Sequence, residues 1–221
     1  MSPDKRDFVR TNTVLAAPPL VPELKLHLAT EITSLWQATE ASLAQSHLPP
    51  PYWAFAWAGG QALARHLLDH PDLARGLSVL DVGAGSGLVA IAAAKAGAAS
   101  VTASDPDPFA AAAIEANAAA NGVSVAVETA DIIGAAPTFD VVLAGDMCYE
   151  RPLAERLVEW LGRCADAGAL VLLGDPGRAY LPKTGLEALA TYQVETPLEL
   201  EDRTMRETTV WRLTPPALPR R

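Results

Sequence analysis

Cysteines, long apolar runs and basic residues are all scarce in this 221-residue sequence, and each shortage argues against a class of protein. The two cysteines, Cys148 and Cys164, form neither a CxxC pair nor a zinc-binding pattern, so the chain has no disulfide framework and suits a reducing compartment. No apolar run approaches the roughly 18 residues of a membrane span. The polar, mixed-charge start MSPDKRDFVRTN does not resemble a signal peptide. We therefore expect a cytoplasmic protein without a membrane partner.

The shortage of positive charge also bears on partners. The chain has 17 basic and 26 acidic residues, which gives a net charge of -9. An acidic surface repels phosphate backbones, so we expect no nucleic-acid partner, whereas a cationic small molecule or a basic patch on another protein would fit. The four histidines form no metal-binding or triad pattern, so we expect no metal.

From residue 77 onward the sequence alternates between strand and helix patterns. We expect strands over 77–83, 100–105, 123–131, 139–146 and 169–176, separated by helices over 87–97, 108–122 and 152–168. This alternation predicts an α/β fold with a parallel sheet that helices cover on both faces. The tail departs from the pattern: 185–191 is typical of a short helix, and 192–202 with 207–214 predicts an antiparallel hairpin at the sheet edge.

The first part of the chain follows no such alternation. Leu24, Leu26 and Leu28 would share one face of a short strand over 23–28, and 34–45 suits a helix. The three prolines within 48–57 require an extended segment, and 59–71 predicts a helix that Pro71 ends.

The stretch VLDVGAGSG (79–87) places glycines between a strand and a helix, where small residues let a ligand approach the backbone. Its spacing is GxGxG, because Leu88 stands where the dinucleotide fingerprint GxGxxG has its last glycine. Asp81 lies beside this loop, where it would repel a pyrophosphate. The same carboxylate could take the ammonium of a cofactor that carries an amino acid.

Two further acids end successive strands. Asp105, 24 residues after Asp81, is placed to accept both hydroxyls of a ribose, and Asp131 is placed near an adenine amino group. A lone acid of this kind is more often a helix cap. Three of them together with the glycine loop indicate a ligand site at the carboxyl ends of the strands.

Over about residues 77 to 213 these features resemble the class I S-adenosylmethionine-dependent methyltransferases, whose sheet ends in a hairpin as strands six and seven. The resemblance implies a Rossmann-like fold with a mostly parallel seven-stranded sheet, an N-terminal extension over 1–50 and a methyltransferase domain over 51–221. The cofactor would be S-adenosyl-L-methionine. The residues that it implies for cofactor binding are Trp57, Gly59, Asp81, Gly83, Ala84, Gly85, Gly87, Asp105, Pro106, Asp131, Ile132 and Gly145.

Two segments narrow the acceptor. PYWAFAWAGGQALARHLLD (51–69) is similar to a region of the seven-β-strand protein lysine methyltransferases in which residues matching Trp57, Gly59 and Gly60 cover the cofactor. DMCY (146–149) matches the DxxY-type motif of that group. Methyltransferases acting on adenine or glutamine carry NPPY or DPPY there, so the missing proline pair argues against a nucleobase acceptor.

With NAAANG (117–122), ETTVWRL (207–213) and VPELKLHLAT (21–30), the chain most resembles the electron transfer flavoprotein β-subunit lysine methyltransferases, including bacterial members. The resemblance implies a protein substrate, that β-subunit. Two alternatives stay open: a methyltransferase acting on a ribosomal protein or a small nicotinamide-like amine, and a module without activity that binds a nucleotide or a partner protein.

Asp146 and Tyr149 are the expected catalytic residues. The donor is a sulfonium, and a lysine must be neutral to attack its methyl group. The Asp146 carboxylate would favour binding of the cationic lysine and orient its amine, which is mainly a positioning effect. Tyr149 would form a wall of the lysine channel. Cys148 is expected to pack rather than react, and Asp175 with Arg178 would either form a turn or frame the entrance.

Overall fold

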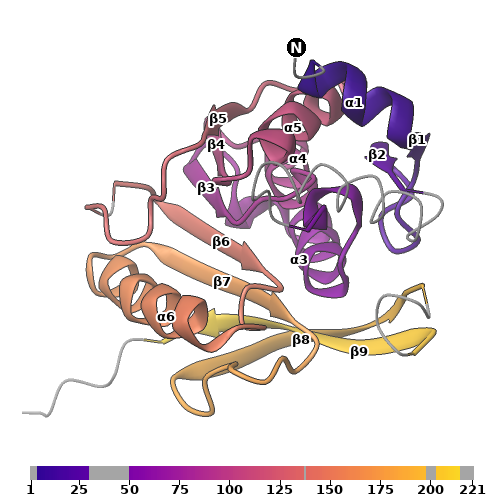
Figure 1. The fold of residues 1–221 in the computed structure, drawn as a ribbon. Coiled ribbons are helices and arrows are strands. Elements are labelled where there is room, and N and C mark those ends of the chain that lie inside the picture. The colour runs from indigo at the N-terminus through magenta and orange to yellow at the C-terminus, as the bar shows by residue number, and fades with distance from the viewer. Residues whose placement is uncertain (1–3, 30–49, 137, 198–202, 215–221) are drawn as a thin grey trace, which may run out of the picture.

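The computed structural model describes residues 4–29, 50–136, 138–197 and 203–214, and its centre is a seven-stranded sheet (Figure 1). The strand order is β5-β4-β3-β6-β7-β9-β8, and the first five strands of that order run parallel. β9 is antiparallel to both β7 and β8, so the predicted hairpin is confirmed. The strands are β3 (Ser78–Val82), β4 (Ser100–Ser104), β5 (Ala126–Glu128), β6 (Val141–Gly145), β7 (Leu170–Asp175), β8 (Leu186–Glu195) and β9 (Met205–Leu213).

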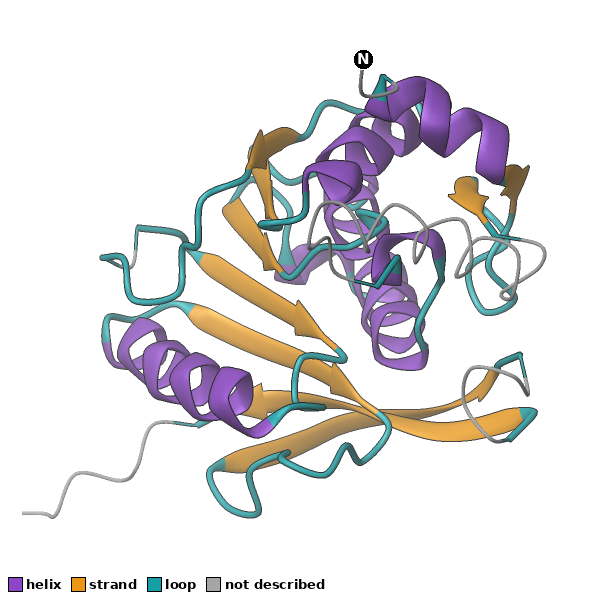
Figure 2. Cartoon of the chain, viewed as in Figure 1, coloured by secondary structure: helices purple, strands orange, loops and turns teal. Residues whose placement is uncertain are grey.

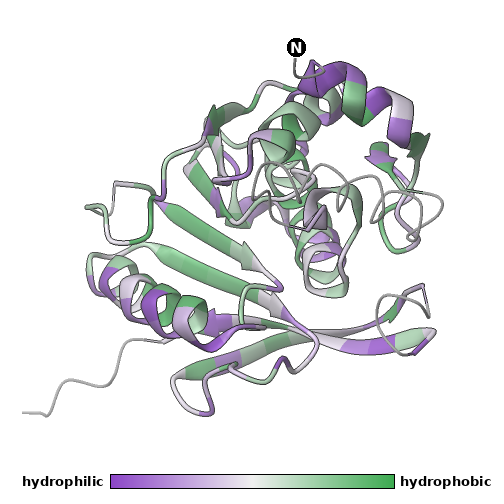
Figure 3. Ribbon diagram, in the orientation of Figure 1, coloured by the Kyte–Doolittle hydropathy of each residue, from purple (hydrophilic) through white to green (hydrophobic). Residues whose placement is uncertain are grey.

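Helices cover both faces of this sheet, because alternate residues of each strand point to opposite sides. On β3, Val79 packs with apolar side chains of α3 (Ala58–Asp69) and α4 (Leu88–Lys95), and α5 (Pro108–Ala120) lies beside them. Leu80 and Val82 point the other way, toward α6 (Arg151–Asp166). Figure 2 shows α6 on the opposite side of the sheet from α3 and α4, and Figure 3 shows the apolar character of β6 and β7 between them.

The N-terminal elements pack beside this core. α1 (Lys5–Asn12) contacts α5, while β1 (Val14–Ala16) and β2 (Leu26–Leu28) pair as a separate two-stranded antiparallel sheet. Leu24 and Leu26 are buried against Ile91 of α4, as the alternating pattern predicts. The helix expected over 34–45 lies outside the described residues. Two 3-10 turns, η1 (Tyr52–Ala54) and η2 (Pro71–Leu73), flank α3. Among the helices that the structure describes, none combines the length and apolar character needed to cross a membrane.

The prediction of a helix over 185–191 is wrong, because β8 already begins at Leu186. The run Leu-Glu-Ala-Leu-Ala has strong intrinsic helix propensity, but its backbone pairs with β9, where Leu186 faces Leu213 and Ala188 faces Trp211. Local propensity is a weak preference that long-range pairing overrides. The hairpin is therefore longer than the sequence predicts.

Candidate cofactor and acceptor site

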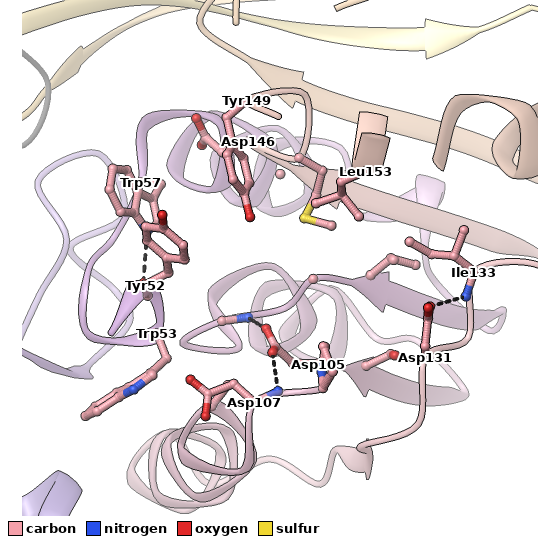
Figure 4. A pocket seen from close by; sticks show the side chains of 18 of the residues that line it. Tyr52, Trp53, Trp57, Asp105, Asp107, Asp131, Ile133, Asp146, Tyr149 and Leu153 are labelled. Atoms are coloured by element: carbon pink, nitrogen blue, oxygen red, sulfur yellow. Dashed lines mark hydrogen bonds between the residues drawn. The ribbon is translucent and has the colours of Figure 1, made fainter. Parts of the chain in front are cut away.

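A cavity of about 670 Å³ opens at the carboxyl ends of the parallel strands, where ligands of such sheets bind. Figure 4 shows Asp105, Asp107 and Asp131 along one side of it, with Trp57, Asp146 and Tyr149 on the other. We call the first side the cofactor end and the second the acceptor end. The lining comes from segments within 50–57, 82–85, 104–110, 131–133 and 145–156, together with Arg178.

The glycine loop between β3 and α4 forms the floor of the cofactor end. Gly83 and Gly85 line the cavity, and Gly83 has a φ of 64° that favours glycine. A Cβ atom at Gly83 would collide with the side chain of Met147, which lies over the loop. Gly87 instead precedes the first residue of α4 and packs under Ile114, so it shapes the loop without lining the cavity.

Asp105 ties this loop to the end of β4. Its Oδ2 accepts a hydrogen bond from the Gly85 amide at 2.9 Å, and its Oδ1 accepts one from the Asp107 amide at 2.9 Å. Asp107 caps α5 through the Phe109 amide, and burial raises the pKa of Asp107 to about 6. Burial also raises the pKa of Asp105. Asp105 is thus a fixed carboxylate at the cavity wall, suited to accept hydrogen bonds from ligand hydroxyls.

Asp81 lies behind the glycine loop, on a small second cavity of about 40 Å³. Only 1% of Asp81 is exposed, and its Oδ2 accepts a hydrogen bond from the Ala90 amide at 2.9 Å. Burial, assisted by the charge of Asp105, raises the pKa of Asp81 to about 7. The two cavities share Trp57, Gly83, Gly85 and Gly145 as lining residues. A cation that entered the smaller one would offset the cost of ionising Asp81.

The far side of the cofactor end is apolar with one ion pair at its rim. Ile132, Ile133 and Leu153 line it. Asp131 accepts a hydrogen bond from Arg156 Nη2 at 2.6 Å, and this contact holds the pKa of Asp131 below its usual value. A flat apolar ring with a polar edge would fit between these side chains.

Asp146 anchors the acceptor end. It is 7% exposed and has a φ of 57°, a left-handed conformation that is uncommon outside glycine. Its Oδ2 accepts from the amides of Gly59 and Gly60 at the start of α3, and its Oδ1 accepts from Arg178 Nε at 3.0 Å and Nη2 at 2.7 Å. The positive end of the α3 dipole and a guanidinium therefore both stabilise this carboxylate.

The backbones of α3 and β7 lie in close contact beside Asp146. A Cβ atom at Gly59 would collide with the carbonyl oxygen of Gly174, and one at Gly174 would collide with the carbonyl oxygen of Gly59. The first turn of α3 therefore lies directly on the end of β7. Gly59 lines neither cavity, and its described contacts are with Asp146 and Gly174.

Three aromatic side chains wall the acceptor end. The ring centroid of Tyr52 lies 5.7 Å from that of Tyr149 and 5.9 Å from that of Trp57. The indole N–H of Trp57 donates to the Tyr52 carbonyl at 2.9 Å, and the Arg178 guanidinium lies 5.8 Å from the Trp57 ring centre. Tyr149 is 42% exposed, so its ring stands at the mouth of the cavity. Partial burial raises the pKa of its hydroxyl, which therefore stays protonated.

The structure gathers most of the predicted site residues around the two cavities. Those that line them are Trp57, Asp81, Gly83, Ala84, Gly85, Asp105, Pro106, Asp131, Ile132, Gly145, Asp146 and Tyr149. Gly59 and Gly87 lie behind the lining, and their contact with a cofactor stays a prediction. Lining residues that the sequence did not predict include Tyr52, Met147, Leu153 and Arg156. Of these, Tyr52 and Met147 fall inside segments already singled out, 51–69 and 146–149. Cys148 is fully buried and its pKa is raised to about 12 by burial, so it is packed rather than reactive.

Comparison with known sequences gives matches to two groups of methyltransferases. A family model described as ribosomal protein L11 methyltransferase (PrmA) matches residues 62–158. The electron transfer flavoprotein beta subunit lysine methyltransferase of Danio rerio is 38% identical over 95% of this chain and 83% of its own length. The Homo sapiens protein of the same name is 36% identical over 97% of this chain and 84% of its own length.

Solved structures show the same fold. Magnesium protoporphyrin IX methyltransferase from Synechocystis PCC 6803, with bound SAM, is similar with a TM-score of 0.52 and 21% identity, over 70% of this chain and 78% of that one. Ribosomal protein L11 methylase from Lactobacillus delbrueckii subsp. bulgaricus is similar with a TM-score of 0.50 and 23% identity, over 72% and 80%. At these identities the likeness concerns the fold, a Rossmann-like methyltransferase sheet.

Proposed function

Because the chain belongs to the electron transfer flavoprotein beta subunit lysine methyltransferase family, we propose that it transfers methyl groups from S-adenosylmethionine to lysines of that beta subunit. It is a methyltransferase of protein lysine side chains, and the beta subunit is the substrate that its relatives are named for. The observation that carries the proposal is a cavity that joins the carboxylates of Asp105 and Asp131, at the ends of strands, to an aromatic mouth.

The residues of the cofactor end fit S-adenosylmethionine. The buried Asp81 carboxylate, whose pKa is about 7 without a cationic neighbour, would take the cofactor's ammonium. Asp105 would accept the ribose hydroxyls, and the apolar slot beside Ile132 would hold the adenine. When bound, the cofactor supplies an electrophilic methyl group on a positively charged sulfur.

The acceptor end holds and orients a lysine side chain. Tyr52, Trp57 and Tyr149 form walls along which the apolar lysine stem can pack while they exclude water. The Tyr149 hydroxyl can hydrogen-bond the amine nitrogen, and Asp146 fixes the loop that carries Tyr149. Among the described residues that line the cavity none is a histidine, and the proton of the lysine ammonium leaves to water before attack. Placing the amine in line with the methyl group is then mainly a matter of orientation.

The direct test uses purified enzyme, labelled S-adenosylmethionine and the two-subunit flavoprotein. We expect label on lysines of the beta subunit alone, located by peptide mass spectrometry. A beta-subunit variant with those lysines changed to arginine is the matched control and should take no label. Nicotinamide and ribosomal protein L11 are assayed in parallel. Transfer to either of them, without transfer to the beta subunit, would refute the proposed substrate.

A further inference from the structure

The Asp146 carboxylate already receives as many hydrogen bonds as it can well accept. An ionised carboxylate offers about four lone-pair positions. The Gly59 and Gly60 amides approach one oxygen, and Nε and Nη2 of Arg178 approach the other. A lysine ammonium that paired with Asp146 would have to displace Arg178. The side chains of both residues are nearly buried and line the cavity, so Arg178 occupies the place where such a pair would form.

Among the described residues, Arg178 is the cation that forms an ion pair with Asp146, and the other groups around the pair are acidic or neutral. The first turn of α3 contributes no acidic residue. On the loop after β7, Asp175 accepts hydrogen bonds from the Gly177 and Arg178 amides, so it holds the turn that presents the guanidinium. On the loop after β6, Tyr149 and Cys148 are neutral because burial raises the pKa of each, and Glu150 is exposed. Across the cavity lies Asp105, whose charge also acts on Tyr149.

We propose that Arg178 is a positioning residue that neutralises Asp146, so that the substrate lysine enters the acceptor end as an uncharged amine rather than as an ion-paired ammonium. This rests on the proposed function, since it concerns the lysine that is methylated. Asp146 then holds Arg178, the start of α3 and the loop that carries Tyr149 in place. The lysine amine contacts Tyr149 next to the Asp146–Arg178 pair, whose charges cancel.

The physical reason lies in the protonation of lysine. A free lysine has a pKa of about 10.4, so at pH 7 only about one in 2,500 is the amine that can attack. A carboxylate without a partner within about 4–6 Å would raise that pKa by roughly one to three units and make the amine rarer still. Pairing with Arg178 cancels this effect of the Asp146 charge.

The first test is the pH dependence of kcat for methyl transfer at saturating beta subunit, because kcat reports the pKa of the bound lysine whereas kcat/KM reports free enzyme and free substrate. We expect Arg178→Gln to shift the acidic limb of kcat upward by about one pH unit, with rates approaching the wild type at high pH. Arg178→Lys, which keeps the charge, should shift it much less. The double variant Arg178→Gln with Asp146→Asn should return the limb toward its wild-type position, whatever its absolute rate. A loss by the same factor at every pH would show a merely structural role and overturn the proposal.

A second test needs only the wild-type enzyme, so it decides the matter even if the Arg178 variants do not fold. Binding of the beta subunit to enzyme saturated with S-adenosylhomocysteine is compared with binding of a beta subunit whose modified lysine is changed to methionine. We expect affinities within about threefold, because the ammonium gains no ion pair. A lysine form bound more than about tenfold tighter at neutral pH would overturn the proposal. Absence of any wild-type labelling of the beta subunit would instead refute the proposed function, and the pH test would then use the amine that is labelled.

Discussion

Asp81 and Asp146 are both buried carboxylates at strand ends, yet the protein treats them in opposite ways. Asp81 accepts one hydrogen bond from a backbone amide, and burial raises its pKa to about 7. Asp146 accepts from two helix-start amides and from a guanidinium. At the cofactor end, Asp81 would therefore be stabilised by a cation of the ligand, whereas at the acceptor end the protein supplies the cation itself, Arg178. The comparison predicts that substitutions at the cofactor end change cofactor affinity, whereas substitutions at the acceptor end change kcat.

The largest effect is expected at the acceptor end. Asp146→Asn should lower kcat by about a hundredfold, since loss of the Arg178 ion pair misplaces the Tyr149 loop by a small distance. Affinity for S-adenosylhomocysteine should stay within about threefold of wild type, because Asp81 and Asp105 are untouched. Asparagine tolerates the left-handed backbone at this position, so the change tests charge rather than strain. Steady-state kinetics and calorimetry measure the two quantities.

Asp166→Asn, at the exposed end of α6, is the matched control that removes a carboxylate far from the cavity. It should leave both quantities unchanged. If Asp146→Asn weakened cofactor binding as strongly as it slowed turnover, the two ends would not act separately.

The second-largest effect is expected on stability, at the close backbone contact between α3 and the end of β7. Gly59→Ala should lower the free energy of unfolding by about 2 kcal/mol, because its methyl group would collide with the Gly174 carbonyl. Gly60→Ala is a closely matched control, since a Cβ atom there meets only Leu88 and Val89 at 3.9 Å. It should be neutral or stabilise the helix by up to about 1 kcal/mol. Urea denaturation measures both, and equal stabilities would show that the close approach of α3 to β7 is not required.

A smaller effect is expected at the cofactor end. The pKa of Asp81 is raised in the folded protein, so the folded state without cofactor binds an extra proton, and its stability falls as pH rises from about 4 to 7. The ammonium of the bound cofactor favours the ionised form of Asp81, so affinity for S-adenosylhomocysteine should rise about tenfold between roughly pH 6 and pH 8.

Asp81→Asn should remove most of that pH dependence and lower the affinity at about pH 8 by roughly tenfold. Asp107, with a pKa of about 6, and Asp105 leave a smaller residual dependence in the variant. Calorimetry at several pH values gives the comparison. An affinity that did not change with pH in the wild type would mean that Asp81 does not meet the cofactor's ammonium.

The smallest effect on kcat is expected at the mouth of the cavity, where Tyr149 stands. Tyr149→Phe keeps the ring that contacts Tyr52 and removes one hydrogen bond, so kcat should fall about fivefold with little change in KM. Tyr180→Phe, another exposed tyrosine that lines neither cavity, is the control. A Tyr149→Phe enzyme as active as the control would restrict Tyr149 to a packing role.

Local pattern predicted most of the fold and of the cofactor end. Strand and helix periods are readable within a dozen residues, and the glycine loop with Asp105 follows from where parallel strands end. The acceptor end depends on contacts between distant segments, such as Gly59 with Asp146 and Arg178 with Asp146, and no spacing in the sequence encodes them. The same limit explains the strand that replaces the expected helix over 185–191, where pairing with β9 outweighs the preference of its residues.

The contact of α3 with the end of β7 has a consequence for biosynthesis. Gly59 leaves the ribosome early, but its partners Asp146 and Gly174 are 87 and 115 positions later in the chain. A nascent polypeptide can therefore assemble the glycine loop and β4 well before it can close the substrate entrance. The emergence of residues 174–178 supplies the last groups of the acceptor end, and β8 and β9 must still follow before the sheet is complete.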